Sequence, residues 1–334
     1  MRRLSVFFAL IALAGCGQLE EPAAAEPVPS ELEGTLFVAN KRDASLSKID
    51  LTSGAETKRA DSCENPHELA ISPDGGHVVL VCYSGTSLEI FTTDTLERVA
   101  QIELGENARP HGVLWHVSGR IVATAEGRGT IFTVDDALSQ APVVAEIGEN
   151  KGDGPHMVVL SDDGSTAWGA VIPEDTVIRY DLAAGKETHR TVLSGRTEGI
   201  ALTPDGAGLF VGTLAESKVF RLDPDNLATL AEIDVGRVPI RVMAHPQGQF
   251  IVTSDLQDGG LSVVDATTTQ VVRSIPVSGN EDATQVTVIF SPGGERLYVA
   301  ETATNTVAEV DFDSGKVLRR LSGGPGGDGL AVTD

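Results

Sequence analysis

Short runs of apolar residues recur along the chain from residue 34 onward, each four to six positions long. Four types follow one another. A run such as Leu36–Asn40 is followed by an alternating run that ends at an aspartate, as in Leu46–Asp50. A third type resembles Val317–Leu321, and a fourth, such as Glu68–Ser72, precedes a tight turn. Period-2 alternation over such lengths predicts β-strands, and no segment has the length and period of a long helix.

The four-strand unit repeats seven times, with a period of about 42 to 46 residues. A turn marks most copies, and its Pro, Asp and Gly residues suit the dihedral angles of a tight reversal. The turns read Ser72-Pro73-Asp74-Gly75, Val117-Ser118-Gly119, Ser161-Asp162-Asp163-Gly164, Thr203-Pro204-Asp205-Gly206, His245-Pro246-Gln247-Gly248 and Ser291-Pro292-Gly293-Gly294. A fixed period of this length, filled with short strands, predicts an all-β, seven-bladed propeller of four-stranded blades.

The phase of the repeat predicts how the ring closes. The first strand after residue 34 is of the Leu36–Asn40 type, and the last, at residues 329–333, is of the Glu68–Ser72 type, which precedes the Leu36–Asn40 type in every repeat. We therefore expect the C-terminal strand to join the N-terminal strands in one blade. Such closure removes the exposed sheet edges that invite aggregation.

The repeated phrases resemble those of the YVTN-type β-propellers. They are Leu36-Phe37-Val38-Ala39-Asn40, Ser72-Pro73-Asp74-Gly75 and Leu297-Tyr298-Val299-Ala300-Glu301. The resemblance covers residues 34–334 and implies the fold. It does not imply one activity, because that family includes surface-layer proteins, lactonase-like enzymes and metal-handling proteins, and one fold hosts many functions.

One position of the repeat carries unusual chemistry. It lies five residues before the first residue of the turn, at the start of the innermost strand, and holds His67, His111, His156, Glu198, Ile240, Val286 and Asp328. Because Asp328 and His67 belong to neighbouring blades of a closed ring, the order is Asp, His, His, His, Glu and two apolar residues. We expect these side chains to converge at one mouth of the central channel.

Three imidazoles flanked by carboxylates match the ligands that a divalent transition metal such as zinc or copper prefers. We therefore take His67, His111, His156, Asp328 and Glu198 as candidate metal ligands. Two other interpretations stay open. The histidines could line a water-filled channel, or they could be protonated beside the carboxylates and bind a small anionic ligand. The chain's other four histidines fall outside this row.

The N-terminus predicts export. Met1-Arg2-Arg3 precedes an apolar run that is too short to span a bilayer, as in a secretory signal. The following Leu13-Ala14-Gly15-Cys16 resembles the lipobox of bacterial lipoproteins, which implies lipidation of Cys16 and an anchor on the periplasmic face of the outer membrane. We divide the chain into a signal peptide (1–15), a lipidated flexible tether (16–33) and the propeller (34–334).

The net charge of the chain indicates which classes of partner it favours. The 25 basic and 48 acidic residues give a formal charge of −23, which disfavours nucleic acid as a partner and favours cations or basic proteins.

An oxidising compartment permits a disulfide between Cys63 and Cys82. Pairing Ile71 with Val78 across the turn would place His67 opposite Cys82. The two thiols lack a third ligand at the spacing of a zinc site.

The leading hypothesis is a membrane-anchored binding protein of the periplasm or cell envelope, with a metal on the histidine row. No catalytic residue is assigned. A second hypothesis is an enzyme of the lactonase or lactonising type, for which the candidates are His111 or His156, Glu198, Arg196 and Arg241. A third is a non-catalytic scaffold that binds an envelope protein. The chain lacks a covalent haem motif, a nucleophile elbow and a phosphate loop.

Overall fold

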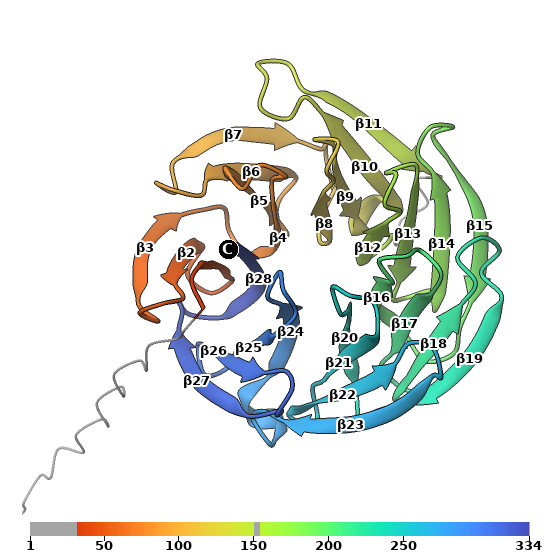
Figure 1. Cartoon of the computed structure of the whole chain (residues 1–334). Coiled ribbons are helices and arrows are strands. Elements are labelled where there is room, and N and C mark those ends of the chain that lie inside the picture. Colours follow the sequence, from red (N-terminus) through yellow and green to blue (C-terminus); the bar gives the residue numbers. More distant parts are fainter. Residues whose placement is uncertain (1–31, 150–153, 334) are drawn as a thin grey trace, which may run out of the picture.

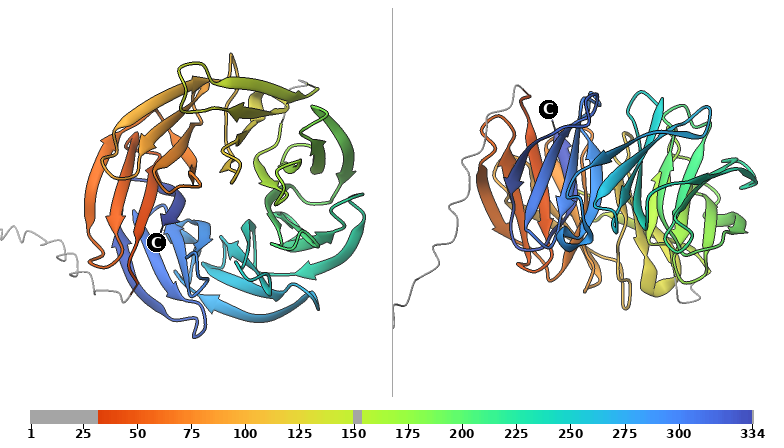
Figure 2. Two further views of the ribbon diagram at one scale, coloured as in Figure 1. Left: turned by 45° about the horizontal axis from the view of Figure 1, so that its top comes forward. Right: turned by 90° about the horizontal axis from the view of Figure 1, so that it is seen from below.

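The computed structural model describes residues 32–149 and 154–333, which form seven four-stranded antiparallel sheets arranged as the blades of a ring (Figure 1). The all-β, seven-bladed propeller predicted from the repeat is confirmed. Figure 2 shows the blades as the wall of a short cylinder. In this part of the chain, helix is limited to two 3-10 turns, η1 (Glu126–Arg128) and η2 (Glu281–Ala283), and no helix is long and apolar enough to cross a membrane.

Each blade has its first strand at the ring axis and its fourth strand at the outer surface. Blade 1 is β28 (Gly327–Thr333), β1 (Thr35–Asn40), β2 (Ser45–Asp50) and β3 (Glu56–Asp61); blade 2 is β4 (Pro66–Ile71), β5 (His77–Cys82), β6 (Ser87–Thr92) and β7 (Arg98–Glu103); blade 3 is β8 (Val113–Trp115), β9 (Ile121–Ala125), β10 (Thr130–Asp135) and β11 (Val143–Gly148); blade 4 is β12 (Met157–Leu160), β13 (Thr166–Val171), β14 (Thr176–Asp181) and β15 (Lys186–Val192). Blade 5 is β16 (Thr197–Leu202), β17 (Leu209–Thr213), β18 (Lys218–Leu222) and β19 (Thr229–Asp234); blade 6 is β20 (Pro239–Ala244), β21 (Phe250–Asp255), β22 (Gly260–Asp265) and β23 (Gln270–Pro276); blade 7 is β24 (Gln285–Phe290), β25 (Arg296–Glu301), β26 (Thr306–Asp311) and β27 (Val317–Ser322).

The ring closes through blade 1, as the phase of the repeat predicts. Strand β28 pairs antiparallel with β1, with Leu36 opposite Val332 and Val38 opposite Leu330. The inner strands β28, β4, β8, β12, β16, β20 and β24 contact one another in that order, and β24 contacts β28. The first and last described strands therefore lie in one sheet and close the ring between them.

The hydrophobic core lies between the blades. Seven clusters of buried apolar residues are present in the described part of the chain, and each combines side chains from two adjacent blades. Between blades 1 and 2, for example, Phe37 and Leu46 pack with Leu80 and Phe91. Each sheet buries both faces against its neighbours. Its middle strands are accordingly apolar on both sides, and its outer strand is largely exposed.

A β-bulge opens most inner strands. In β4, Pro66 pairs with Cys82 and Leu69 with Leu80, so His67 and Glu68 together face the single residue Val81. The same irregularity begins β16, β20 and β24 and interrupts β28. A residue with positive φ precedes the bulge in each of these strands, namely Asn65, Arg196, Val238, Thr284 and Gly326. Bulges re-aim side chains, and in this ring they do so in register around the axis.

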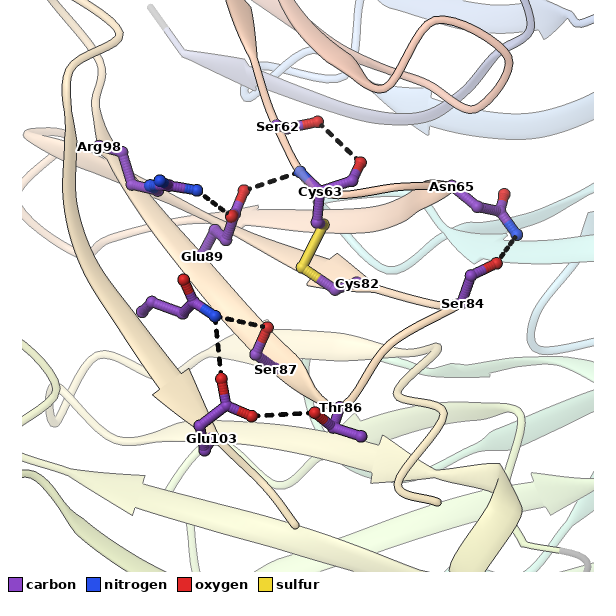
Figure 3. Close-up of a disulfide and its surroundings, with 11 residues drawn as sticks. Ser62, Cys63, Asn65, Cys82, Ser84, Thr86, Ser87, Glu89, Arg98 and Glu103 are labelled. Atoms are coloured by element: carbon purple, nitrogen blue, oxygen red, sulfur yellow. Dashed lines mark hydrogen bonds and ion pairs between the residues drawn. A yellow bond between two sulfur atoms is a disulfide. The ribbon is translucent and has the colours of Figure 1, made fainter. Parts of the chain in front are cut away.

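The bulge corrects one detail of the expected register. Ile71 does pair with Val78, but Cys82 lies opposite Pro66 rather than His67, because the extra residue shifts the strand by one position. Cys63 and Cys82 form a disulfide with a Cα–Cα separation of 5.7 Å (Figure 3). The carboxylate of Glu89 accepts a hydrogen bond from the Cys63 backbone N–H at 3.0 Å. The disulfide therefore ties the segment leading into β4 to the end of β5.

The signal peptide and most of the tether, including Cys16, lie outside the described residues. Their predicted processing and lipidation remain predictions.

Candidate functional site

The three histidines of the row stack side by side near the ring axis. The ring centroids of His67 and His111 are 4.1 Å apart, and those of His111 and His156 are 3.4 Å apart. They come from three consecutive blades, and in each the histidine follows a proline at the entry to the inner strand. All three are buried, with His111 only 1 % exposed. The repeat therefore brings together the three imidazoles that the sequence placed in one row.

Carboxylates flank the stack at both ends. Asp328 Oδ2 lies 3.1 Å from His67 Nδ1 and 2.7 Å from Lys41 Nζ. At the other end, Glu198 Oε1 lies 3.5 Å from His156 Nε2. Lys41 belongs to the loop between β1 and β2, so that loop lies on the same face as the row. The predicted order of Asp, three His and Glu is present in space.

A second row lies one residue further along each inner strand, and it contains an ion pair that sequence reasoning missed. Glu68 of blade 2 contacts Arg241 of blade 6 across the ring axis. Arg241 Nη1 also lies 3.8 Å from Glu198 Oε1. Strict alternation would turn position 68 away from position 67, whereas the bulge gives both the same orientation. Glu68 and Arg241 are 7 % and 4 % exposed, so the ion pair is buried inside the ring.

Glycine occupies the second row where neighbouring inner strands pack too closely for a side chain. A Cβ at Gly329 would lie 1.9 Å from the carbonyl oxygen of His67, and one at Gly199 would lie 2.7 Å from the amide nitrogen of Val242. These contacts are with backbone atoms, which cannot rotate away. The glycines thus set the spacing between blades that brings the histidine rings together.

Glu126 connects the stack to a polar network at the rim. It is the first residue of η1, and its carboxylate contacts His156 Nδ1. Its second oxygen accepts hydrogen bonds from Tyr83 Oη at 2.9 Å and from Arg109 Nη2 at 2.6 Å. Arg109 Nη2 also donates to Tyr83 Oη at 2.5 Å. Sequence reasoning gave no signal for Tyr83, which follows the disulfide cysteine Cys82.

The environment shifts the pKa values of His111 and His156 in opposite directions. Burial, together with the nearby charges of His156 and His67, holds the pKa of His111 well below its usual range, so its ring is neutral. Burial also opposes the charging of His156, but contacts with Glu126 and Glu198 prevail and raise the pKa of that imidazole. Burial raises the pKa of the Glu126 carboxyl, but its contacts with His156, Tyr83 and Arg109 outweigh burial and lower that pKa.

A compact set of potential metal ligands lies within the stack. Ligand atoms of His67, Glu68 and His111 all lie within 4.8 Å of one another. Among the residues the structure describes, His111 Nδ1 is buried and has no hydrogen-bond partner. Both nitrogens of His156, in contrast, face carboxylates. His156, Glu198 and Asp328 therefore adjoin this set rather than complete it.

The remaining residues of the row and the other histidines lie apart from this chemistry. Val286 is buried, and Ile240 continues the row on blade 6. His245 packs against Phe290 and Phe312, while His116 contacts the carbonyl oxygen of Asp162. Repeat position therefore separates the stacked histidines from the rest.

Comparison with known proteins agrees with the propeller fold. A family model described as YNCE-like beta-propeller matches residues 9–334. The chain belongs to this family. This YNCE-like propeller is 23 % identical to Protein NirF of Stutzerimonas stutzeri over 300 residues, which cover 84 % of the chain and 75 % of the relative. It is 27 % identical to Protein NirF of Pseudomonas aeruginosa over 256 residues, which cover 70 % of the chain and 64 % of that relative.

A solved structure shows the same fold. The crystal structure of a functionally unknown protein from Desulfotomaculum acetoxidans DSM 771 superimposes with a TM-score of 0.76 at 16 % identity. The alignment covers 89 % of the YNCE-like chain and 98 % of the other protein.

Proposed function

We propose that this propeller is a binding protein of the cell envelope and that it holds a divalent transition metal near the ring axis. His67 and His111 supply nitrogen ligands, and Glu68 supplies a carboxylate oxygen. Zinc and copper are the metals that suit two imidazoles and a carboxylate. The proposed ligand set thus keeps two residues of the predicted row and adds Glu68.

One observation carries the proposal. The Nδ1 atom of His111 is buried and unpartnered within the described part of the chain. An unsatisfied buried polar atom costs free energy, and a metal ion is one way to satisfy it. The ring is also neutral, as metal ligation requires. A tetrahedral zinc holds its ligands about 3.4 Å apart, and the ligand atoms of this set already lie within 4.8 Å of one another.

The neighbouring groups would support such a site. Asp328 contacts His67, and carboxylates that orient ligating histidines are typical of metal centres. Arg241 keeps Glu68 ionised, because the nearby guanidinium outweighs burial and lowers the pKa of that carboxyl. An ionised glutamate is the form that binds a cation.

The lactonising-enzyme hypothesis receives less support. That chemistry needs an arginine to hold a substrate carboxylate. Arg241 is buried and contacts Glu68 and Glu198, while Arg196 is exposed and its backbone N–H donates to Asp175 at 2.5 Å. The scaffold hypothesis needs no metal, so a metal measurement separates it from our proposal.

The metal is tested by elemental analysis. Purified protein is incubated with zinc or with copper, dialysed and compared with a variant carrying His67→Ala, His111→Ala and His156→Ala. We expect about one ion per wild-type chain and none in the variant. His189→Ala, on the exposed strand β15, is the matched control and should keep the metal. Equal and near-zero metal in wild type and triple variant would refute the proposal.

The envelope location is a separate part of the proposal. The Cys63–Cys82 disulfide suits an oxidising compartment. Labelling of cells with a radioactive fatty acid should mark the wild-type protein and leave Cys16→Ser unlabelled. Equal labelling of the two proteins, or no labelling of either, would refute the proposed lipid anchor and would leave the proposed metal site untested by this experiment and unchanged.

A further inference from the structure

A small pocket opens beside the histidine stack on the side of blades 2 to 4. It measures about 220 Å³ and is lined by Tyr83, Arg109, Glu126, Gly154, His156, Ile172 and Pro173. Drug-sized ligands occupy about 300–1,000 Å³, so this pocket suits a smaller molecule. Tyr83, Arg109, Glu126 and His156 give the lining polar side chains, and Ile172 and Pro173 give it apolar ones.

We infer that this pocket binds a small organic acid through its carboxylate. The inference deepens the proposed binding role and rests on it, but it does not require the metal. Arg109 supplies the anion-binding group, and Tyr83 and Glu126 hold Arg109 in place.

The guanidinium of Arg109 is held in one orientation while keeping donors available. Its Cζ lies 5.0 Å from the centroid of the Tyr83 ring, a cation–π arrangement. The hydrogen bonds found for this side chain use Nη2 alone, toward Tyr83 and Glu126. The Nε and Nη1 donors make none within the described residues. The side chain is 54 % exposed, so those donors are accessible from solvent.

A carboxylate suits these donors. A guanidinium presents paired N–H groups that match the two oxygens of a carboxylate. Arginine also keeps its charge at all ordinary pH values. The formal charge of the whole chain is −23, which favours a small anion over a polyanion at this arginine.

The apolar part of the lining distinguishes an organic acid from an inorganic oxyanion. Ile172 and Pro173 offer no charged groups to solvate a second face of sulfate or phosphate. They offer contact to a short carbon chain, whose burial is favourable. A ligand with a carboxylate at one end and a few carbon atoms at the other therefore matches both the polar and the apolar groups that line the pocket.

Isothermal titration calorimetry tests the inference on the full chain after treatment with EDTA. The probes are pyruvate, lactate and succinate, with inorganic phosphate and sulfate as comparison anions. We expect at least one organic acid to bind and the inorganic anions to bind at least tenfold more weakly. Absence of binding by all three acids would overturn the inference, and so would equal binding of phosphate or sulfate.

Variants assign the binding to the pocket. Arg109→Gln should weaken the acid by about 10- to 100-fold, because it removes charge-assisted hydrogen bonds. Arg237→Gln is the matched control, since Arg237 is also a rim arginine that pairs with a carboxylate, in its case that of Asp258, but it does not line the pocket. Its affinity should equal that of the wild type. Equal weakening in both variants would show a general charge effect and would contradict the inference.

The outcomes for metal and acid are independent. Arg109→Gln should keep the wild-type zinc content, because Arg109 is not among the proposed ligands. Acid binding without zinc would leave the pocket in place and refute the metal, whereas zinc without acid binding would do the reverse.

Discussion

The buried ion pair between Glu68 and Arg241 allows a quantitative test of how the axis is built. Replacing Arg241 by methionine keeps much of the side-chain volume but leaves the carboxylates of Glu68 and Glu198 without their shared cation. Removing one partner of a buried pair typically costs about 3–5 kcal/mol of stability, whereas replacing both partners is often close to neutral. We expect Arg241→Met to cost that amount, and Arg241→Met combined with Glu68→Gln to recover most of it.

The pH dependence of the single variant follows from the pKa of Glu68. In the wild type, Arg241 lowers the folded-state pKa of this carboxyl, so its stabilising contribution is present above the unfolded value and is lost as pH falls through the folded value. In Arg241→Met, burial dominates and raises the pKa. The folded variant then favours the protonated acid, and its deficit relative to the wild type should shrink as pH falls from 7 to 4.

Equilibrium urea unfolding in EDTA at pH 7 and pH 4 measures both effects. Glu68→Gln alone completes the double-mutant cycle, and the coupling energy between the two positions should exceed about 1 kcal/mol. A single-variant cost below about 1 kcal/mol, or additive effects of the two substitutions, would show that the pair does not form across the axis.

Three further predictions concern the disulfide, a buried acid and the spacing of the blades. Replacing Cys63 and Cys82 by alanine should cost about 3 kcal/mol, since the bond spans 19 residues of sequence; reductant should destabilise the wild type to the same extent in urea unfolding. Burial raises the pKa of Asp255 to about 6, so its protonated form stabilises the fold at low pH and that contribution is lost as pH rises through 6. Asp255→Asn should therefore raise stability at pH 8 by up to about 3 kcal/mol and give no gain below pH 4, and an equal gain at both pH values would contradict this assignment. Gly329→Ala should lower both stability and zinc content, because its Cβ would meet the carbonyl oxygen of His67 at 1.9 Å; unchanged zinc content would show that blade spacing does not set the site.

The repeat predicted the fold and the stack because both depend on periodicity. Strand type, blade number and closure follow from a pattern that recurs seven times. The same alignment placed His67, His111 and His156 on one row, and side chains at equivalent positions of neighbouring blades lie close together in a propeller.

The parts that sequence reasoning missed depend on local breaks in that pattern. Glu68 faces the axis because of a β-bulge, and alternation along a regular strand would have turned it away. Its partner Arg241 is distant in sequence, so no local signal joins them. Tyr83 reaches the site from a loop and Glu126 from the short turn η1, and the strand pattern determines the conformation of neither. Positive φ at Arg196 and Val238 gave no sequence signal, because arginine and valine rarely adopt the left-handed region.

The metal that we propose between His67 and His111 can be located by diffraction from crystals grown with zinc and measured at the zinc absorption edge. We expect one anomalous peak about 2.0–2.1 Å from a ring nitrogen of each histidine, with a Glu68 oxygen among the ligands. A well-diffracting crystal with no peak beside these rings, or with zinc bound elsewhere instead, would contradict the proposal.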